Sequence, residues 1–134
     1  MSEDLWGDIS VEKEIKLPVT ILKEQATILG EKTNKILEAK VTSVGVGNKE
    51  TVGYSLNIIA PALSNYKYNV LTITHPAIFV YPVNVVYKRE NGGAVQAACK
   101  DEAAFNEKLK EILSSEIVHK AIVALISQSK ATAS

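Results

Sequence analysis

The stretch from residue 39 to residue 99 most constrains the fold, because it is typical of consecutive β-strands separated by short turns. Two of these turns, residues 47–50 and 90–93, contain glycine and asparagine, and Asn-Gly in particular adopts the positive φ values of tight hairpins. Short connections favour antiparallel pairing of strands that are neighbours in the chain. The sequence therefore predicts a five-stranded antiparallel meander, with strands at residues 41–46, 52–60, 66–74, 78–87 and 95–99.

Helical patterns flank the strands on both sides, at residues 18–39, 102–113 and 116–128. Pro18 suits the first turn of the first helix, because its missing N–H would be unpaired there anyway. Asp101 predicts the N-cap of the second helix. Ser114 and Ser115 predict a break before the third, with one continuous C-terminal helix as the alternative. The predicted fold class is α+β: a helix, a five-stranded antiparallel meander sheet, then one or two C-terminal helices, with the helices mainly on one face of the sheet.

The length of 134 residues suits one domain, and neither a repeat nor a linker divides residues 1–134. Residues 1–16 include Leu5 and Trp6 among charged residues, which is more apolar content than a disordered tail carries. We therefore expect part of this lead-in to dock on the domain, with a frayed segment as the alternative. Residues 129–134 are small and polar, so the C-terminal tail should fray.

The centre of the strand region is apolar on both alternations, so both faces of that part of the sheet need to be covered. One alternation should lie under the helices: Leu71, Ile73, Phe79, Tyr81, Val83, Val85 and Tyr87. The opposite alternation is aromatic and β-branched, with hydroxyls instead of charges: Tyr66, Tyr68, Val70, Thr72, Ile78, Val80 and Val86, with Ile59 beside them. Five strands make a sheet about 24 Å wide and each helix covers about 10 Å, so two helices nearly fill one face.

The opposite face is the predicted partner-binding site, because exposed apolar patches on soluble domains usually mark interaction surfaces. The residues assigned to it are Tyr66, Tyr68, Val70, Thr72, Ile78 and Val80. A homodimer through this face is the leading option, since two-fold self-contacts are the commonest assembly. Coverage of the face by residues 1–16 or by the last helix is the alternative. The expected function is that of a non-catalytic interaction protein that self-associates or binds a protein partner through its sheet face or edge.

No constellation of residues indicates catalysis, and we assign no catalytic residue, metal or cofactor. No Ser, Cys or carboxylate is spaced from His75 or His119 in a pattern typical of a catalytic site. Two separated histidines and one cysteine are too few clustered ligands for a closed zinc site. Cys99 is expected to be a buried, small apolar residue rather than a reactive thiolate. The alternative function is a small-ligand-binding or enzymatic domain with a pocket between sheet and helices. Its polar groups would be Tyr54, His75, Tyr81, Tyr87 and Cys99.

Charge and composition argue against two classes of partner. Lys+Arg and Asp+Glu both number 15, so there is no overall field to attract a nucleic acid or an acidic membrane. Nucleic-acid binding would require Lys67, Lys88, Arg89 and Lys100 on one surface. No run approaches the ~20 apolar residues of a membrane helix. The acidic N-terminus lacks the features of a signal peptide, and the single cysteine gives no sign of an oxidising compartment, so we expect a cytoplasmic protein.

Overall fold

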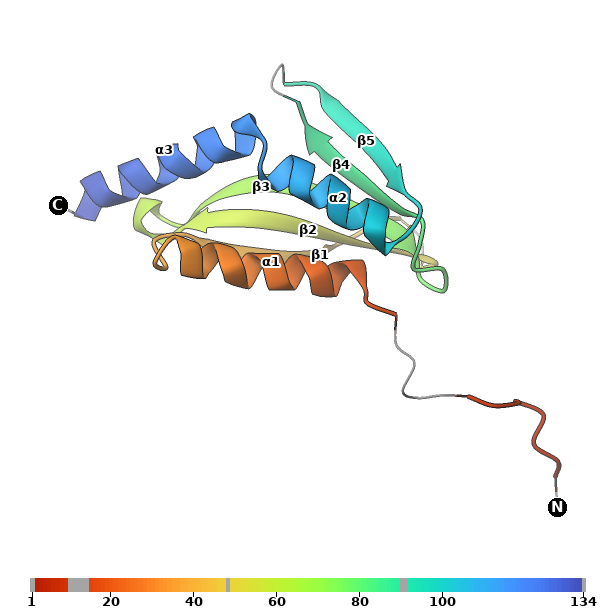
Figure 1. Ribbon diagram of the computed structural model, residues 1–134. Helices are drawn as coiled ribbons and strands as arrows, with labels where there is room; N and C mark the ends of the chain where they lie inside the picture. The colour runs from red at the N-terminus through yellow and green to blue at the C-terminus, as the bar shows by residue number, and fades with distance from the viewer. Residues whose placement is uncertain (1, 10–14, 48, 90–91, 134) are drawn as a thin grey trace.

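The computed structural model describes residues 2–9, 15–47, 49–89 and 92–133. Its elements, in chain order, are α1 (Pro18–Lys32), β1 (Glu38–Val44), β2 (Thr51–Ala60), the 3-10 turn η1 (Pro61–Leu63), β3 (Tyr66–Pro76), β4 (Val83–Lys88), β5 (Ala94–Cys99), α2 (Glu102–Leu113) and α3 (Glu116–Ala133) (Figure 1). The five strands pair antiparallel in the order β1-β2-β3-β4-β5. This arrangement confirms the predicted α+β class and the meander.

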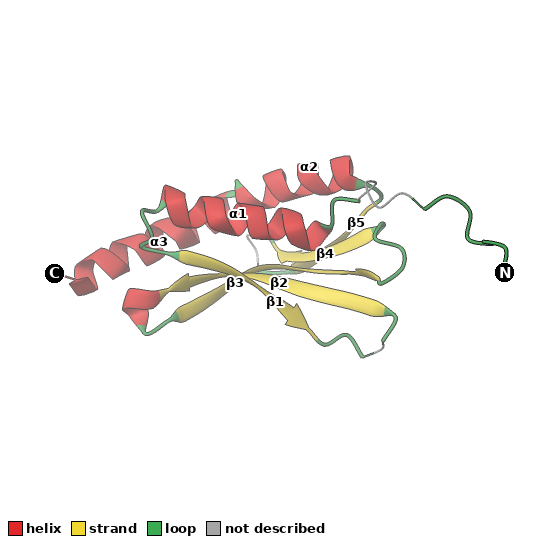
Figure 2. Cartoon of the chain, turned by 90° about the horizontal axis from the view of Figure 1, so that it is seen from below, coloured by secondary structure: helices red, strands yellow, loops and turns green. Residues whose placement is uncertain are grey.

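The three helices lie on the same side of the sheet, and the opposite side carries no described helix (Figure 2). α1 packs on β1 and β2, α2 packs on β5, and α3 reaches past the sheet beside η1 (Figure 1). Phe105 of α2 and Leu22 of α1 are fully buried in the layer between helices and sheet. The sheet contributes Leu56, Ile58, Leu71, Ile73, Val83 and Val85 to the same core.

α1 ends earlier than the apolar spacing predicts. The helix stops at Lys32, and Asn34 and Lys35 adopt left-handed backbone with φ of 52° and 63°. Leu37 is fully buried, but it reaches the core from the turn, where its N–H donates to the Thr33 hydroxyl oxygen at 3.3 Å. The predicted helix over residues 18–39 is therefore wrong beyond Lys32, because a buried turn residue continued the helical spacing. β1 begins at Glu38, three residues before the predicted strand.

The connection between β3 and β4 also differs from the prediction. β3 continues through His75 and Pro76, where a turn was expected, and residues 77–82 form the loop. β4 begins directly after Pro82, whose missing N–H cannot donate to a sheet ladder. Phe79, expected under the helices, lies in this loop and is 65% exposed. The predicted strand over residues 78–87 is thus wrong in its first half.

A one-residue irregularity between β2 and β3 changes which side chains face the helices. Leu56 pairs with Leu71, whereas Asn57 pairs with Asn69, so Val70 is an extra residue on β3. Such a bulge reverses the alternation on one side of it. Val70 is consequently buried among Leu29, Leu56 and Val118 on the helix face, and Tyr66 and Tyr68 turn toward α3. The expectation that these three residues lie on the opposite face is wrong.

Both helix signals near the C-terminus are confirmed. The Asp101 side chain caps α2 by accepting from the Ala104 N–H at 2.8 Å. The chain breaks at Ser114 and Ser115, and the Ser115 hydroxyl accepts from the Val118 N–H at the start of α3. α3 continues to Ala133 and Ser129 is buried, so the helix includes most of the tail that was expected to fray.

The N-terminal segment does not dock on the domain over its described residues. Residues 2–9 are exposed throughout, and Leu5 and Trp6 are 86% and 83% exposed. Figure 1 shows this segment extending away from the body of the molecule. The expected docking of residues 1–16 is therefore not observed for residues 2–9, while residues 10–14 lie outside the described part. Among the described helices, none combines the length and apolarity needed to span a membrane.

Gly53 in β2 gives the first test of this packing. A Cβ at this position would lie 2.8 Å from the Val44 Cγ2 and Val46 Cγ1 atoms and 3.3 Å from the Thr74 Cγ2 atom. We expect Gly53→Ala to lower the free energy of unfolding by about 1–3 kcal/mol, because overpacking displaces strand neighbours. Urea denaturation measures this change. Gly45→Ala is the matched control, because its Cβ would meet no atom within 4 Å, and equal stability of both variants would contradict the packing described.

Candidate protein-binding surfaces

The open face of the sheet is polar and mostly uncharged at its centre. Most of its central side chains are polar, namely Ser55, Asn57, Asn69, Thr72, Thr74, Asn84 and Gln96, but Val86, which pairs with Thr72 and Gln96, is also there and is 39% exposed. The Ser55 and Thr72 hydroxyls are hydrogen-bonded at 2.9 Å, and the Asn69 Nδ2 donates to the Asn57 Oδ1 at 3.0 Å. These four side chains are hydrogen-bonded in pairs without a covering layer. Val86 and Ile59 lie on this face as the sequence predicts, but most of its centre is polar, so it is not the continuous apolar patch expected.

The six residues predicted to form one partner-binding face are dispersed. Tyr66 and Tyr68 line a hollow of about 410 Å³ beneath α3, and Val70 belongs to the core. Thr72 lies on the open face, where it pairs with Ser55. Ile78 and Val80 lie in the β3–β4 loop. The bulge and the late start of β4 at Val83 explain the dispersal. No sequence signal marks the bulge, because both Val70 and Leu71 are apolar.

The five polar groups of the alternative pocket also fail to converge. His75 is buried in β3, with its Nδ1 atom 2.8 Å from the Pro76 carbonyl oxygen. The Lys108 ammonium lies 5.9 Å from the centre of the Tyr87 ring. The Tyr81 hydroxyl donates a long hydrogen bond to the Lys16 carbonyl oxygen. The larger hollows in the described part of the chain each contain at most one of the five residues, Tyr54, His75, Tyr81, Tyr87 and Cys99.

Cys99 lies at the end of β5 and is only 3% exposed. Burial is the main cause that raises the pKa of its thiol; Asp101 adds to this effect and Lys108 opposes it. A raised thiol pKa disfavours the thiolate, which is the nucleophilic form. Among the described residues, no group of three or more His, Cys, Asp or Glu side chains is arranged to hold a metal ion.

The basic residues considered for nucleic-acid binding do not all lie at the same end of the sheet. Lys88 pairs with Ala94 at one end of the β4–β5 hairpin, and Arg89 follows it. Lys100 follows Cys99, whose partner Val83 marks the other end of the same hairpin. The sheet thus separates these charges along its length, which is the opposite of a continuous phosphate-binding stripe.

Exposed apolar side chains gather instead at the end of the molecule where α1 begins. Ile78 and Phe79 of the β3–β4 loop are 85% and 65% exposed, and Ile15 and Leu17 precede α1. The hydrogen bond from the Tyr81 hydroxyl to the Lys16 carbonyl joins the loop to this segment, and both lie at the same end of the molecule in Figure 1. We call Ile15, Leu17, Ile78 and Phe79 the apolar end. Sequence reasoning missed it because it placed Ile78 and Phe79 within a strand.

The two edge strands of the sheet differ in how well they are protected against pairing with a strand of another chain. β1 carries Glu38 and Lys40, which discourage pairing with another strand. β5 has neither a charged residue nor a proline over Ala94–Cys99. An uncharged edge of this kind presents unpaired backbone groups to solvent and is the less protected side of the sheet.

Comparisons with protein-family models, with curated proteins and with solved structures found no match for this chain. Its surfaces are therefore interpreted from their own geometry alone.

The burial of Cys99 gives a second test. In native protein at pH 8, we expect the thiol to react with a disulfide reagent such as DTNB at least about a hundredfold more slowly than in urea, because access requires opening of the structure. The absorbance of the released thiolate follows the reaction. Rapid labelling of folded protein would contradict the burial and would favour the alternative in which Cys99 serves a pocket.

Proposed function

We propose that this chain is a non-catalytic protein-binding module that self-associates through its apolar end. The observation that supports this function is the exposure of Ile78 and Phe79 beside Ile15 and Leu17. Single exposed apolar residues are ordinary, but a group at one end of a small domain is typical of a contact surface. Burying one such side chain contributes roughly 1.5–3 kcal/mol.

A second copy of the chain is a suitable occupant of this surface. In a two-fold contact, the same loop meets itself, so apolar side chains of one copy cover those of the other. Lys16, whose carbonyl accepts from the Tyr81 hydroxyl of the loop, is paired with Glu24 at 2.8 Å, which reduces repulsion between like ends. The chain as a whole has a formal charge of zero, so no global repulsion opposes association. We place this activity in the cytoplasm, a reducing compartment that suits a lone thiol.

The mass in solution tests the proposal. We expect sedimentation velocity or light scattering to give a mass near twice 14.5 kDa at high concentration, falling toward 14.5 kDa on dilution. The double variant Ile78→Asp/Phe79→Asp should weaken dimerisation by at least roughly a hundredfold, since about 3 kcal/mol of apolar burial is lost per pair of side chains.

Val123→Asp is the matched control, because Val123 is 62% exposed but lies on α3, remote from the loop. This variant should dimerise like the wild type, and circular dichroism should show that all variants are folded. A wild-type mass that stays monomeric at every concentration would refute the proposal. Unchanged dimerisation of the Ile78→Asp/Phe79→Asp variant would refute the apolar end as the contact surface.

A further inference from the structure

A groove between α1 and α2 has a chemical character of its own. It has a volume of about 550 Å³, and its floor is formed by Ile21 of α1 with Leu109 and Leu113 of α2. The two helices run beside one another on the sheet in Figure 2. A volume of this size is within the range that small ligands or a few side chains occupy.

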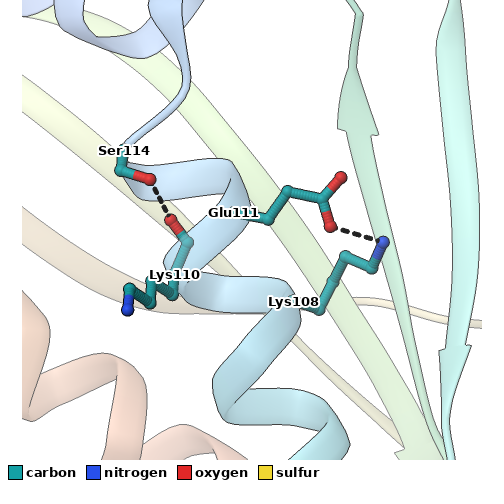
Figure 3. Close-up of polar contacts among 4 residues, drawn as sticks. All are labelled: Lys108, Lys110, Glu111 and Ser114. Carbon is teal, nitrogen blue, oxygen red and sulfur yellow. Dashed lines mark hydrogen bonds and ion pairs between the residues drawn. The ribbon is translucent and has the colours of Figure 1, made fainter.

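The rim of this groove is basic. Lys32 from α1, Lys110 from α2 and His119 from α3 line it, and no carboxylate does so among the described residues. Lys108 and Glu111 form a 2.9 Å ion pair, and Figure 3 shows Lys110 directed away from this pair, toward the side where α1 lies. Neither Lys32 nor Lys110 forms an ion pair within the part of the chain that the structure describes. The groove thus combines an apolar floor with unneutralised positive charge.

The N-terminal arm, residues 2–9, has the complementary composition. Its apolar side chains, Leu5, Trp6 and Ile9, are largely exposed. Glu3, Asp4 and Asp8 alternate with them and give the arm three negative charges. The arm makes no packing contact with its own domain in Figure 1, so a large apolar area stays in water.

We infer that residues 3–9 of a second copy bind in the groove between α1 and α2. This inference rests on the proposed self-association, because the arm leaves the molecule at the apolar end and both α1 and α2 begin at that same end (Figure 1). When two apolar ends meet, each arm extends from its own copy on the side of the other copy. Exchange of identical segments between copies is an established route to dimers.

The lengths of arm and groove agree. Seven residues in extended conformation span roughly 23 Å at 3.3 Å per residue. From Ile21 to Lys32, α1 rises roughly 16 Å at 1.5 Å per residue. The arm can therefore cover the groove while Trp6 meets the apolar floor and acidic side chains meet Lys32 and Lys110. Because the charged rim is exposed, salt should weaken this contact.

Trp6 is the only tryptophan of the chain, so its fluorescence reports the arm directly. For the wild type, we expect the emission maximum to shift to shorter wavelength as concentration raises the mass from one copy to two. Lys32→Glu/Lys110→Glu should abolish this shift while the apolar end still supports a dimer. Lys23→Glu/Lys40→Glu is the control with the same change in charge, because both lysines line a hollow on the other side of α1, and it should behave like the wild type.

A mixing experiment distinguishes exchange between copies from folding back of the arm. One partner carries Trp6→Ala with an intact groove, and the other carries Lys32→Glu/Lys110→Glu with an intact Trp6. Neither alone should give a blue-shifted signal, but the mixture should, because an intact arm then meets an intact groove only across the dimer. A mixture without the shift would overturn the inference.

The remaining outcomes separate the two proposals. Solvent-exposed Trp6 emission from a wild-type dimer would overturn arm binding and leave self-association standing. A blue-shifted Trp6 in a wild-type monomer would overturn the second copy as occupant of the groove. A monomer with exposed Trp6 at every concentration would overturn both.

Discussion

The single extra residue in β3 is the constraint on which the rest of the molecule depends. At Val70 the pairing with β2 shifts by one position, so Val70 and Leu71 both enter the core. From there toward the start of β3, Tyr68 and Tyr66 also face the helices. This change concentrates apolar side chains on one face and leaves mostly hydroxyl and amide groups on the other, with Val86 among them. α3 then has an aromatic surface to cover beyond the end of α2.

Regular segments of the fold could be predicted from the sequence. In β2, side chains from Val52 to Ile58 alternate between apolar and small or polar, and Tyr54, Leu56 and Ile58 of the apolar set pack in the core. Asp101 and the serine pair at 114 and 115 identify helix termini, because their side chains bond to nearby backbone groups. Each of these signals is local, so neighbouring residues suffice to interpret it.

The errors arise where local and tertiary signals differ. Leu37 continues a helical spacing, but it fills the core from a turn that Asn34 and Lys35 form in left-handed backbone. Ile78 and Phe79 have strong strand propensity, yet Pro82 delays β4 and leaves them in a loop. The candidate surfaces were unpredictable for the same reason. The apolar end joins residues 15–17 to a loop sixty positions later, and the groove collects its lysines from separate helices.

The open face of the sheet affects how the molecule contacts other molecules. There, Ser55 and Thr72 bond to each other, and so do Asn57 and Asn69. A molecule that contacted this surface would leave these four polar groups paired, but it would gain little free energy from the release of water. Chance contacts on the open face of the sheet therefore change the free energy little. If the chain self-associates through its apolar end as proposed, this contrast makes the contact directional.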